Sequence, residues 1–110
     1  MVINFEKEKE EEINGFKGGK GAFLKRATKF GDVNIMRNIL PAGCSIGMHT
    51  HDGNYEIMYV IKGEITYIYD GIEEIAKAGE VHYCPCGHTH CAENRTNKEA
   101  EFLAVVAETK

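Results

Sequence analysis

The sequence lacks a long hydrophobic run, an excess of basic residues and the composition of a disordered chain. No stretch of about 18 consecutive apolar residues occurs, so no membrane-spanning helix is predicted. Basic residues number 13 against 17 acidic ones, and no basic stripe could neutralise a phosphate backbone, which argues against nucleic-acid binding. Only 2 of the 110 residues are proline and 12 are glycine, which favours many short strands joined by turns.

The first residues also lack the basic start and the apolar stretch of a signal peptide. They turn acidic between Glu6 and Glu12, a run interpreted as a solvated tail or an exposed helix. We therefore expect a cytoplasmic protein with no membrane partner. In that compartment cysteines stay reduced; the four of this chain are Cys44, Cys84, Cys86 and Cys91.

Alternating polarity predicts β-structure along most of the chain. Residues 33–40 alternate well and end at a Pro-Ala-Gly turn. Residues 55–61 and 64–69 flank a Lys-Gly turn and predict a hairpin, and Asp70-Gly71 suits a type I′ turn. Further strands are expected at 22–28, 72–77, 81–84, 88–93 and 101–107. The pattern predicts an all-β sandwich or barrel.

The length allows one domain with one core. We divide the chain into a polar N-terminal lead-in segment, residues 1–21, and a β-barrel domain, residues 22–110. No amphipathic helical pattern of useful length follows residue 21.

The histidines carry the chemistry that the sequence suggests. His49 and His51 are two residues apart, so on a strand both imidazoles point to one face. Glu56 follows after a predicted bend, and His90 would have to arrive from a distant strand, as a closed barrel permits. Imidazole and carboxylate ligands suit divalent iron, manganese, nickel, cobalt, copper or zinc. Four such ligands on an octahedral ion leave two positions for other molecules.

Two blocks of this sequence resemble the motifs of the cupin family. The first motif is Gly, five residues, His-x-His, three or four residues, Glu, six residues and Gly. It is matched by Gly43, His49, His51, Glu56 and Gly63. The second is Gly, five residues, Pro-x-Gly, two residues, His, three residues and Asn. It is matched by Gly79, Pro85, Gly87, His90 and Asn94.

The resemblance implies a single-domain jelly-roll β-barrel, the double-stranded β-helix of cupins. It implies one divalent first-row metal per chain, held inside the barrel by His49, His51, Glu56 and His90. It further implies a homodimer that takes up a small molecule. Asn94 is interpreted as structural, because an asparagine there can hydrogen-bond a turn.

The family supports many chemistries, so the fold alone does not give the reaction. The first hypothesis is a metalloenzyme of dioxygenase, isomerase or lyase/decarboxylase type acting on a small oxygen-rich metabolite, with Glu56 and His88 as candidate catalytic groups. The second is a metal-dependent binding or sensing module without turnover. A third is redox chemistry at Cys84, Cys86 and Cys91, although buried reduced cysteines are common in cores.

Several other residues are interpreted from their position in the predicted strands. His82 is interpreted as an ordinary strand residue. Arg26 and Arg37 are candidates to hold an anionic substrate at the barrel mouth. Arg37 in particular shares a face with apolar residues, where a charge needs a partner. Met58 and Val60 share the parity of Glu56 and are expected to line the cavity.

Overall fold

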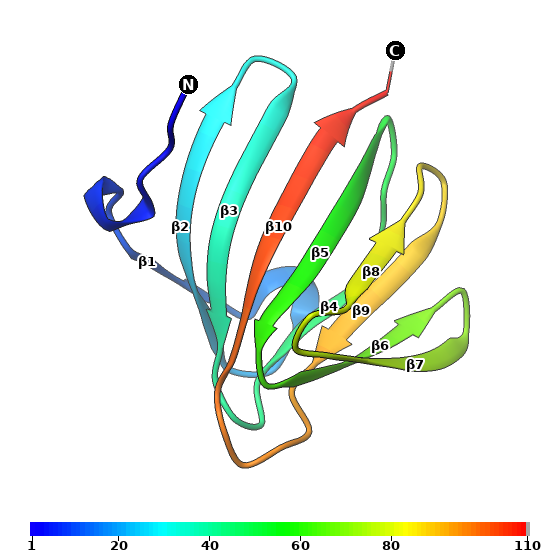
Figure 1. Ribbon diagram of the computed structural model, residues 1–110. Coiled ribbons are helices and arrows are strands. Elements are labelled where there is room, and N and C mark those ends of the chain that lie inside the picture. Colours follow the sequence, from blue (N-terminus) through cyan, green and yellow to red (C-terminus); the bar gives the residue numbers. More distant parts are fainter. Residues whose placement is uncertain (110) are drawn as a thin grey trace.

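The computed structural model describes residues 1–109, which form β-strands and two single-turn 3-10 helices (Figure 1). The elements in chain order are η1 Phe5–Lys7, β1 Glu11–Asn14, η2 Phe16–Gly18, β2 Ala22–Phe30, β3 Val33–Leu40, β4 Ser45–Thr50, β5 Asn54–Lys62, β6 Glu64–Tyr69, β7 Ile72–Lys77, β8 Val81–Cys84, β9 Thr89–Glu93 and β10 Ala100–Glu108. Neither helical turn within residues 1–109 is long and apolar enough to cross a membrane.

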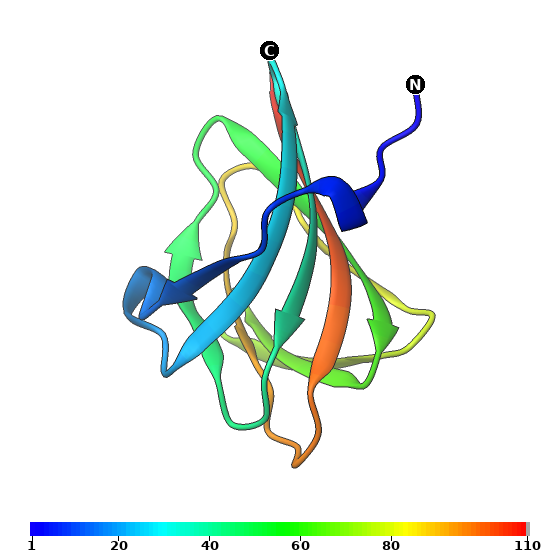
Figure 2. The ribbon, with the colours of Figure 1, turned by 90° about the vertical axis from the view of Figure 1, so that its left-hand side faces the viewer.

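Two antiparallel sheets face each other across a common interior (Figures 1 and 2). The larger sheet has the order β1-β2-β3-β10-β5-β8 and the smaller one the order β4-β9-β6-β7. Strands distant in sequence pair within them; β10, for example, lies between β3 and β5. This arrangement confirms the predicted all-β jelly-roll barrel.

The predicted hairpin between residues 55–61 and 64–69 is wrong. β5 pairs with β10 and β8 of the larger sheet, whereas β6 pairs with β7 and β9 of the smaller one. The Gly63 turn, with a φ of 81°, therefore carries the chain from one sheet to the other. A short turn between two strands predicts a change of direction, but alternation alone does not say which strands pair. The Asp70-Gly71 turn is confirmed, since both residues have positive φ, 48° and 81°.

The N-terminal segment is more structured than a solvated tail or an exposed helix. Residues 11–14 form β1, which pairs with β2 along the edge of the larger sheet. Residues 5–7 form only a single 3-10 turn. Between them the segment crosses in front of β2 in Figure 2. The domain boundary at residue 22 stays a prediction. The segment before it, residues 1–21, contributes strand β1 to the larger sheet.

Two arginines fasten this segment to the barrel instead of facing the cavity. Arg26 Nη1 donates a hydrogen bond to the Glu8 carbonyl at 3.0 Å. Arg37 Nε donates to Glu101 Oε1 at 2.9 Å, and its Nη1 donates to Glu6 Oε1 at 3.3 Å. Glu101 supplies the partner that an arginine on an apolar face requires. The expected role of these arginines in holding substrate is therefore not supported by their positions.

The barrel interior is packed with apolar side chains at one end. Leu40, Val60, Ile65 and Phe102 are all fully buried there. Asn94 lies nearby, and its Nδ2 donates to the carbonyls of Leu40 and Lys98, each at 2.8 Å. The structural interpretation of Asn94 agrees with these bonds.

Candidate metal centre

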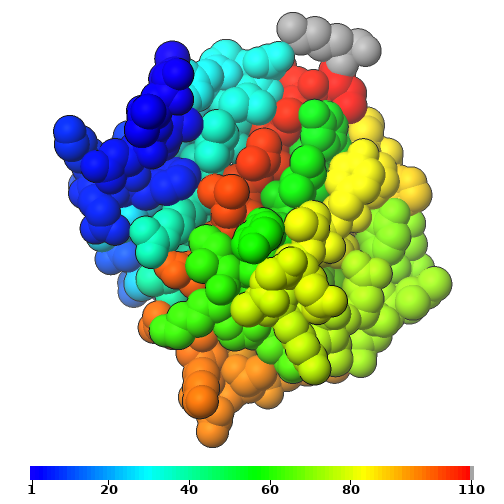
Figure 3. Space-filling view, in the orientation of Figure 1, coloured from blue at the N-terminus to red at the C-terminus, as the bar shows by residue number. Residues whose placement is uncertain are grey.

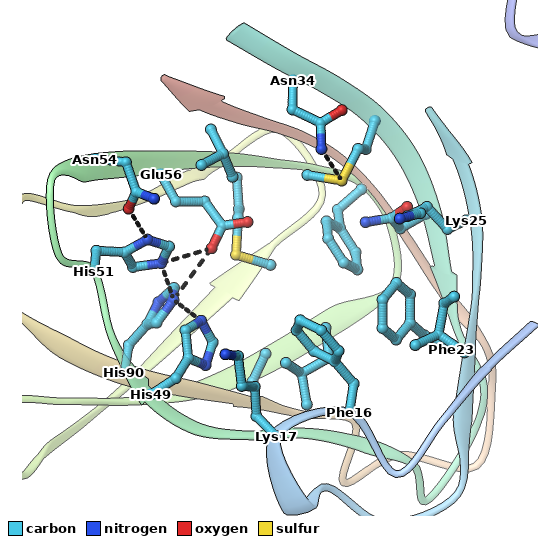
Figure 4. Close-up of a pocket in the computed structure, with 18 of the residues that line it drawn as sticks. Phe16, Lys17, Phe23, Lys25, Asn34, His49, His51, Asn54, Glu56 and His90 are labelled. Atoms are coloured by element: carbon cyan, nitrogen blue, oxygen red, sulfur yellow. Dashed lines mark hydrogen bonds and ion pairs between the residues drawn. The ribbon is translucent and has the colours of Figure 1, made fainter. Parts of the chain in front are cut away.

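The structure brings His49, His51, Glu56 and His90 together inside the barrel, as the spacing predicted (Figure 4). His49 lies on β4, His51 directly follows it, Glu56 lies on β5 and His90 on β9. β4 and β9 are neighbours, and the His49 and His90 positions lie directly opposite in register. Pairing of two strands distant in sequence therefore supplies the fourth group.

The ligand atoms of the four side chains converge closely. His90 Nε2 lies 3.0 Å from His51 Nε2 and 3.2 Å from His49 Nε2. Glu56 Oε1 lies 3.1 Å from His90 Nε2 and 3.2 Å from His51 Nε2. Two ligand atoms at right angles, each about 2.1 Å from an ion, lie about 3.0 Å apart, whereas tetrahedral ligands lie about 3.4 Å apart. The spacing fits one metal ion with right-angled coordination.

Hydrogen bonds on the other ring nitrogens orient the first two imidazoles. His49 Nδ1 lies 2.8 Å from the Gly47 carbonyl oxygen, and His51 Nδ1 lies 2.6 Å from Asn54 Oδ1. Both partners are acceptors, so each Nδ1 carries a hydrogen and donates it. Each neutral ring is then left with a lone pair on Nε2, the form that binds metals.

The third imidazole is oriented by a residue that sequence reasoning missed. His90 Nδ1 lies 2.9 Å from Nε2 of His82, and His82 Nδ1 lies 2.6 Å from Glu74 Oε1. His82 is only 1% exposed, and its ring stacks on Tyr67 with centroids 3.8 Å apart. The sequence shows that His82 alternates with Val81 and Tyr83. It does not show that β8 and β9 bring His82 and His90 together.

Burial and mutual contact shift the pKa values of the cluster. Burial lowers the pKa of His49, whereas the hydrogen bond to Glu56 raises that of His51. Burial alone would raise the pKa of Glu56, but in the metal-free protein hydrogens on Nε2 of His51 and His90, which a metal ion would replace, can be donated to Glu56; these hydrogen bonds outweigh burial and lower the pKa to about 2. Glu56 is therefore a carboxylate at neutral pH, as a metal ligand must be.

A cavity of about 390 Å³ opens beside the cluster. This is the liquid volume of about 13 water molecules at about 30 Å³ each, so the cavity is roomy enough for a small organic ligand. Figure 4 shows the cluster on one side of it and Phe16, Phe23 and Lys25 on the other. Met58 lines the cavity as predicted, while Val60 lies deeper in the packed end.

Lys17 brings a positive charge to the cavity, and sequence reasoning missed it. Its turn is pressed against β4: a Cβ on Gly47 would lie 1.9 Å from the Lys17 carbonyl oxygen, and one on Gly19 would lie 2.2 Å from that of Ser45. Lys20 N also donates to Ser45 Oγ at 2.8 Å. Only glycine permits so close an approach, so these two glycines hold the turn over the cavity.

His88 lies apart from the cluster. Its Nδ1 contacts Asp70 and lies 3.2 Å from the Tyr69 hydroxyl. Among the described residues that line the cavity, His88 is absent. The predicted catalytic role of His88 stays a prediction that this position does not favour, whereas Glu56 stands inside the cluster.

All four cysteines are free thiols. Cys84 and Cys91 are buried, and burial raises the pKa of both, that of Cys84 to about 11. Cys86 is exposed. Thiols buried in this way are protonated at neutral pH and react poorly. Their environment does not favour the hypothesis of redox chemistry at these residues.

Comparison with known proteins defines the class of this chain. Residues 36–106 match the family model of the cupin domain, and the chain belongs to the cupin family.

A curated relative and a solved structure, both from Thermotoga maritima, are similar over nearly the whole chain. The relative is an oxalate-binding protein, 33% identical over an alignment of 112 positions that covers 96% of this chain and 93% of that protein. The crystal structure of a predicted oxalate decarboxylase is 32% identical with a TM-score of 0.92, covering 99% of this chain and all of that one. KdgF from Halomonas sp. shares the fold at 15% identity, with a TM-score of 0.79 and coverage of 98% and 92%.

Proposed function

We propose that this protein binds one divalent first-row transition metal through His49, His51, Glu56 and His90 and uses it to hold a small carboxylate anion. The supporting observation is the set of three Nε2 atoms, 3.0 and 3.2 Å apart from one ring to the next. Each ring has its Nδ1 bonded elsewhere. Lone pairs that face one another beside a carboxylate repel, and a cation relieves that repulsion.

The proposed ligand is a dicarboxylate of the size of oxalate. Four protein ligands with right-angled spacing leave two adjacent positions, which suits an anion that binds through two oxygens. The similarity to an oxalate-binding protein supports this choice.

Lys17 is proposed to face the bound anion. Figure 4 shows its side chain reaching toward His49 and His90 from the turn over the cavity. Its Nζ lies 5.6 Å from the centroid of the Phe16 ring, which also lines the cavity. An ammonium group there balances the second negative charge of a dicarboxylate.

Isothermal titration calorimetry tests this proposal. Oxalate is titrated into protein loaded with Mn²⁺, Co²⁺ or Zn²⁺ and into metal-free protein, with acetate as a control ligand. We expect oxalate to bind the metal-loaded protein at least tenfold more tightly than the metal-free protein, and acetate to bind weakly. Equal oxalate binding with and without metal would contradict the proposal.

A metalloenzyme acting on the same ligand is the second candidate. It is favoured by Glu56, a carboxylate ligand that can release the ion and accept a proton, and by the similarity to a predicted oxalate decarboxylase. Loss of oxalate on incubation with the metal-loaded protein, absent in a Glu56→Gln variant, would support the enzyme. Stoichiometric binding without loss would support the binding module.

A homodimer and a cytoplasmic location belong to the same proposal. The outer face of β5 and β8, green and yellow in Figure 3, carries side chains that are 36–55% exposed: Ile57, Tyr59, Ile61, Val81 and Tyr83. A contiguous apolar face of this kind is typical of protein–protein contact. Light scattering should give the mass of a dimer for this chain and of a monomer for Tyr59→Lys.

The proposed cytoplasmic location is supported by the four free thiols, which suit a reducing compartment.

A further inference from the structure

We propose that His82 and Glu74 form a positioning chain that holds His90 in its metal-binding form from outside the cavity. The inference rests on the proposed metal-binding function. His90 lies on β9, His82 on β8 and Glu74 on β7. β8 is an edge strand of the larger sheet and β7 an edge strand of the smaller one, so the His82–Glu74 bond crosses the seam between the sheets.

Along this hydrogen-bond chain, hydrogens can be donated in only one direction. A carboxylate only accepts, so the hydrogen between Glu74 and His82 sits on His82 Nδ1, 2.6 Å from Glu74 Oε1. The other nitrogen of a neutral His82 ring is then an acceptor. It accepts from His90 Nδ1 at 2.9 Å. His90 Nε2 is left with its lone pair pointing at the cluster.

Packing holds the His82 ring, the middle member of this hydrogen-bond chain, in place. The His82 side chain is fully buried, and its ring stacks on Tyr67 with 14° between the planes. His82 and His90 are also nearly parallel, at 19° with centroids 5.1 Å apart. A buried imidazole needs partners for both nitrogens, and this chain supplies both. Glu74, whose side chain is 47% exposed, connects the buried rings to the surface.

His90 differs in this respect from the other two imidazoles. His49 is oriented by a backbone carbonyl and His51 by a neutral amide. Only His90, among these three, is connected through a second ring to a carboxylate. A carboxylate behind a ligating histidine raises its basicity and strengthens its bond to the metal. Glu74 thereby sets metal affinity without touching the ion.

The first test needs no metal. ¹⁵N NMR of the histidine rings above neutral pH distinguishes a protonated ring nitrogen from one with a lone pair. We expect His90 to be protonated on Nδ1 in the parent protein and in Glu73→Ala, but to populate both tautomers in His82→Leu and Glu74→Ala. Glu73 is the matched control, because it carries the same charge on the same strand and is similarly exposed, but it pairs with Arg95 and not with His82. Unchanged His90 tautomers in both test variants would overturn the inference.

The second test measures metal affinity by titration with Co²⁺, whose visible spectrum reports its ligands. Loss of such outer partners costs about 10–100-fold in metal affinity. We expect a loss in that range for His82→Leu, a smaller loss for Glu74→Ala and none for Glu73→Ala. His82→Gln, whose side-chain oxygen can still accept from His90, should recover part of the loss.

The outcomes separate this inference from the proposed function. Normal Co²⁺ binding by His82→Leu and Glu74→Ala, alongside lost binding in His49→Ala/His51→Ala, would overturn the positioning chain and leave the metal site standing. Absence of Co²⁺ binding by the parent protein would overturn the metal site, and the affinity role of the chain with it. If His82→Leu does not fold, Glu74→Ala still tests the inference, because the Glu74 side chain is 47% exposed and its removal leaves the core intact.

Discussion

The two ends of the barrel interior lie on the same strands but are built from opposite chemistry. On β5, Glu56 faces the histidine cluster, while Val60, four residues along, lies in the apolar end. On β10, Val106 is paired with the Glu56 position and Phe102 with the Val60 position. At the apolar end burial itself stabilises the fold. At the cluster end every buried polar group requires a partner.

The comparison suggests that stability and function can be changed separately. Substitutions at the apolar end should weaken the fold and leave the cluster intact in each folded molecule. Substitutions at the cluster should abolish metal binding at little cost to the fold. The predictions below begin with the largest expected effect.

Phe102→Ala should destabilise the protein by about 3–5 kcal/mol, because it removes a fully buried ring that belongs to the apolar core and also lines the cavity. Urea denaturation of the metal-free protein measures this. The control is Ile72→Ala at the start of β7, outside the proposed dimer face, where the side chain is 69% exposed and the effect should stay below about 1 kcal/mol. Equal effects of the two substitutions would contradict the assignment of Phe102 to the packed end.

Asn94→Ala should cost about 1–3 kcal/mol, because it leaves the carbonyls of Leu40 and Lys98 without their donor. The same denaturation experiment applies, with bound metal per folded chain as a second measurement. Loss of metal without loss of stability would show that Asn94 serves the site and not the fold.

Lys17→Gln should weaken oxalate binding by the metal-loaded protein about three- to tenfold, or about 1 kcal/mol, since an ammonium group open to solvent contributes modestly. Metal affinity should change little. Lys29→Gln, on the exposed end of β2, is the control for net charge. If both variants bind oxalate alike, Lys17 does not face the anion.

Thiol labelling should separate the cysteines by burial. The exposed Cys86 should react first with a maleimide, and Cys84, whose pKa burial raises to about 11, should react only on unfolding. Mass spectrometry of the labelled peptides measures the order. Rapid labelling of Cys84 in the native protein would revive the thiol hypothesis.

The smallest effect concerns Asp70, whose pKa is lowered by a hydrogen bond from the Thr89 amide and by His88. Because the folded pKa lies below the ordinary 3.8, Asp70 stabilises the fold above that pH, and this is lost as the pH falls through the folded pKa. Asp70→Asn, which tolerates the positive φ, should be less stable than the parent at neutral pH only. A difference that persists in acid would contradict this account.

The sequence predicted the convergence of the histidine–glutamate cluster better than it predicted the surroundings of that cluster. The four residues of the cluster follow fixed motif spacings: His49, His51, Glu56 and His90. Such spacings can be recognised in the sequence without knowing how the flanking strands pair. His82 and Lys17 follow no motif. His82 reaches His90 only because of side-chain contacts between β8 and β9, and Lys17 reaches the cavity only because Gly19 and Gly47 allow two backbones to touch.

The wrong hairpin at Gly63 has a similar origin. Alternation identifies a strand and its two faces, but partner choice depends on the whole barrel. β5 and β6 were correctly placed as strands and incorrectly paired. Local pattern therefore predicted most strands, while long-range pairing had to come from the structure.

The most direct test of the metal centre is the metal content of untagged protein by plasma mass spectrometry, after loading and removal of free ions. The account predicts about one iron, manganese, nickel, cobalt, copper or zinc per chain in the parent protein. It predicts background content in a folded His49→Ala/His51→Ala variant. Equal metal content in both proteins, or none in either after loading, would contradict the central claim that these side chains hold a metal ion.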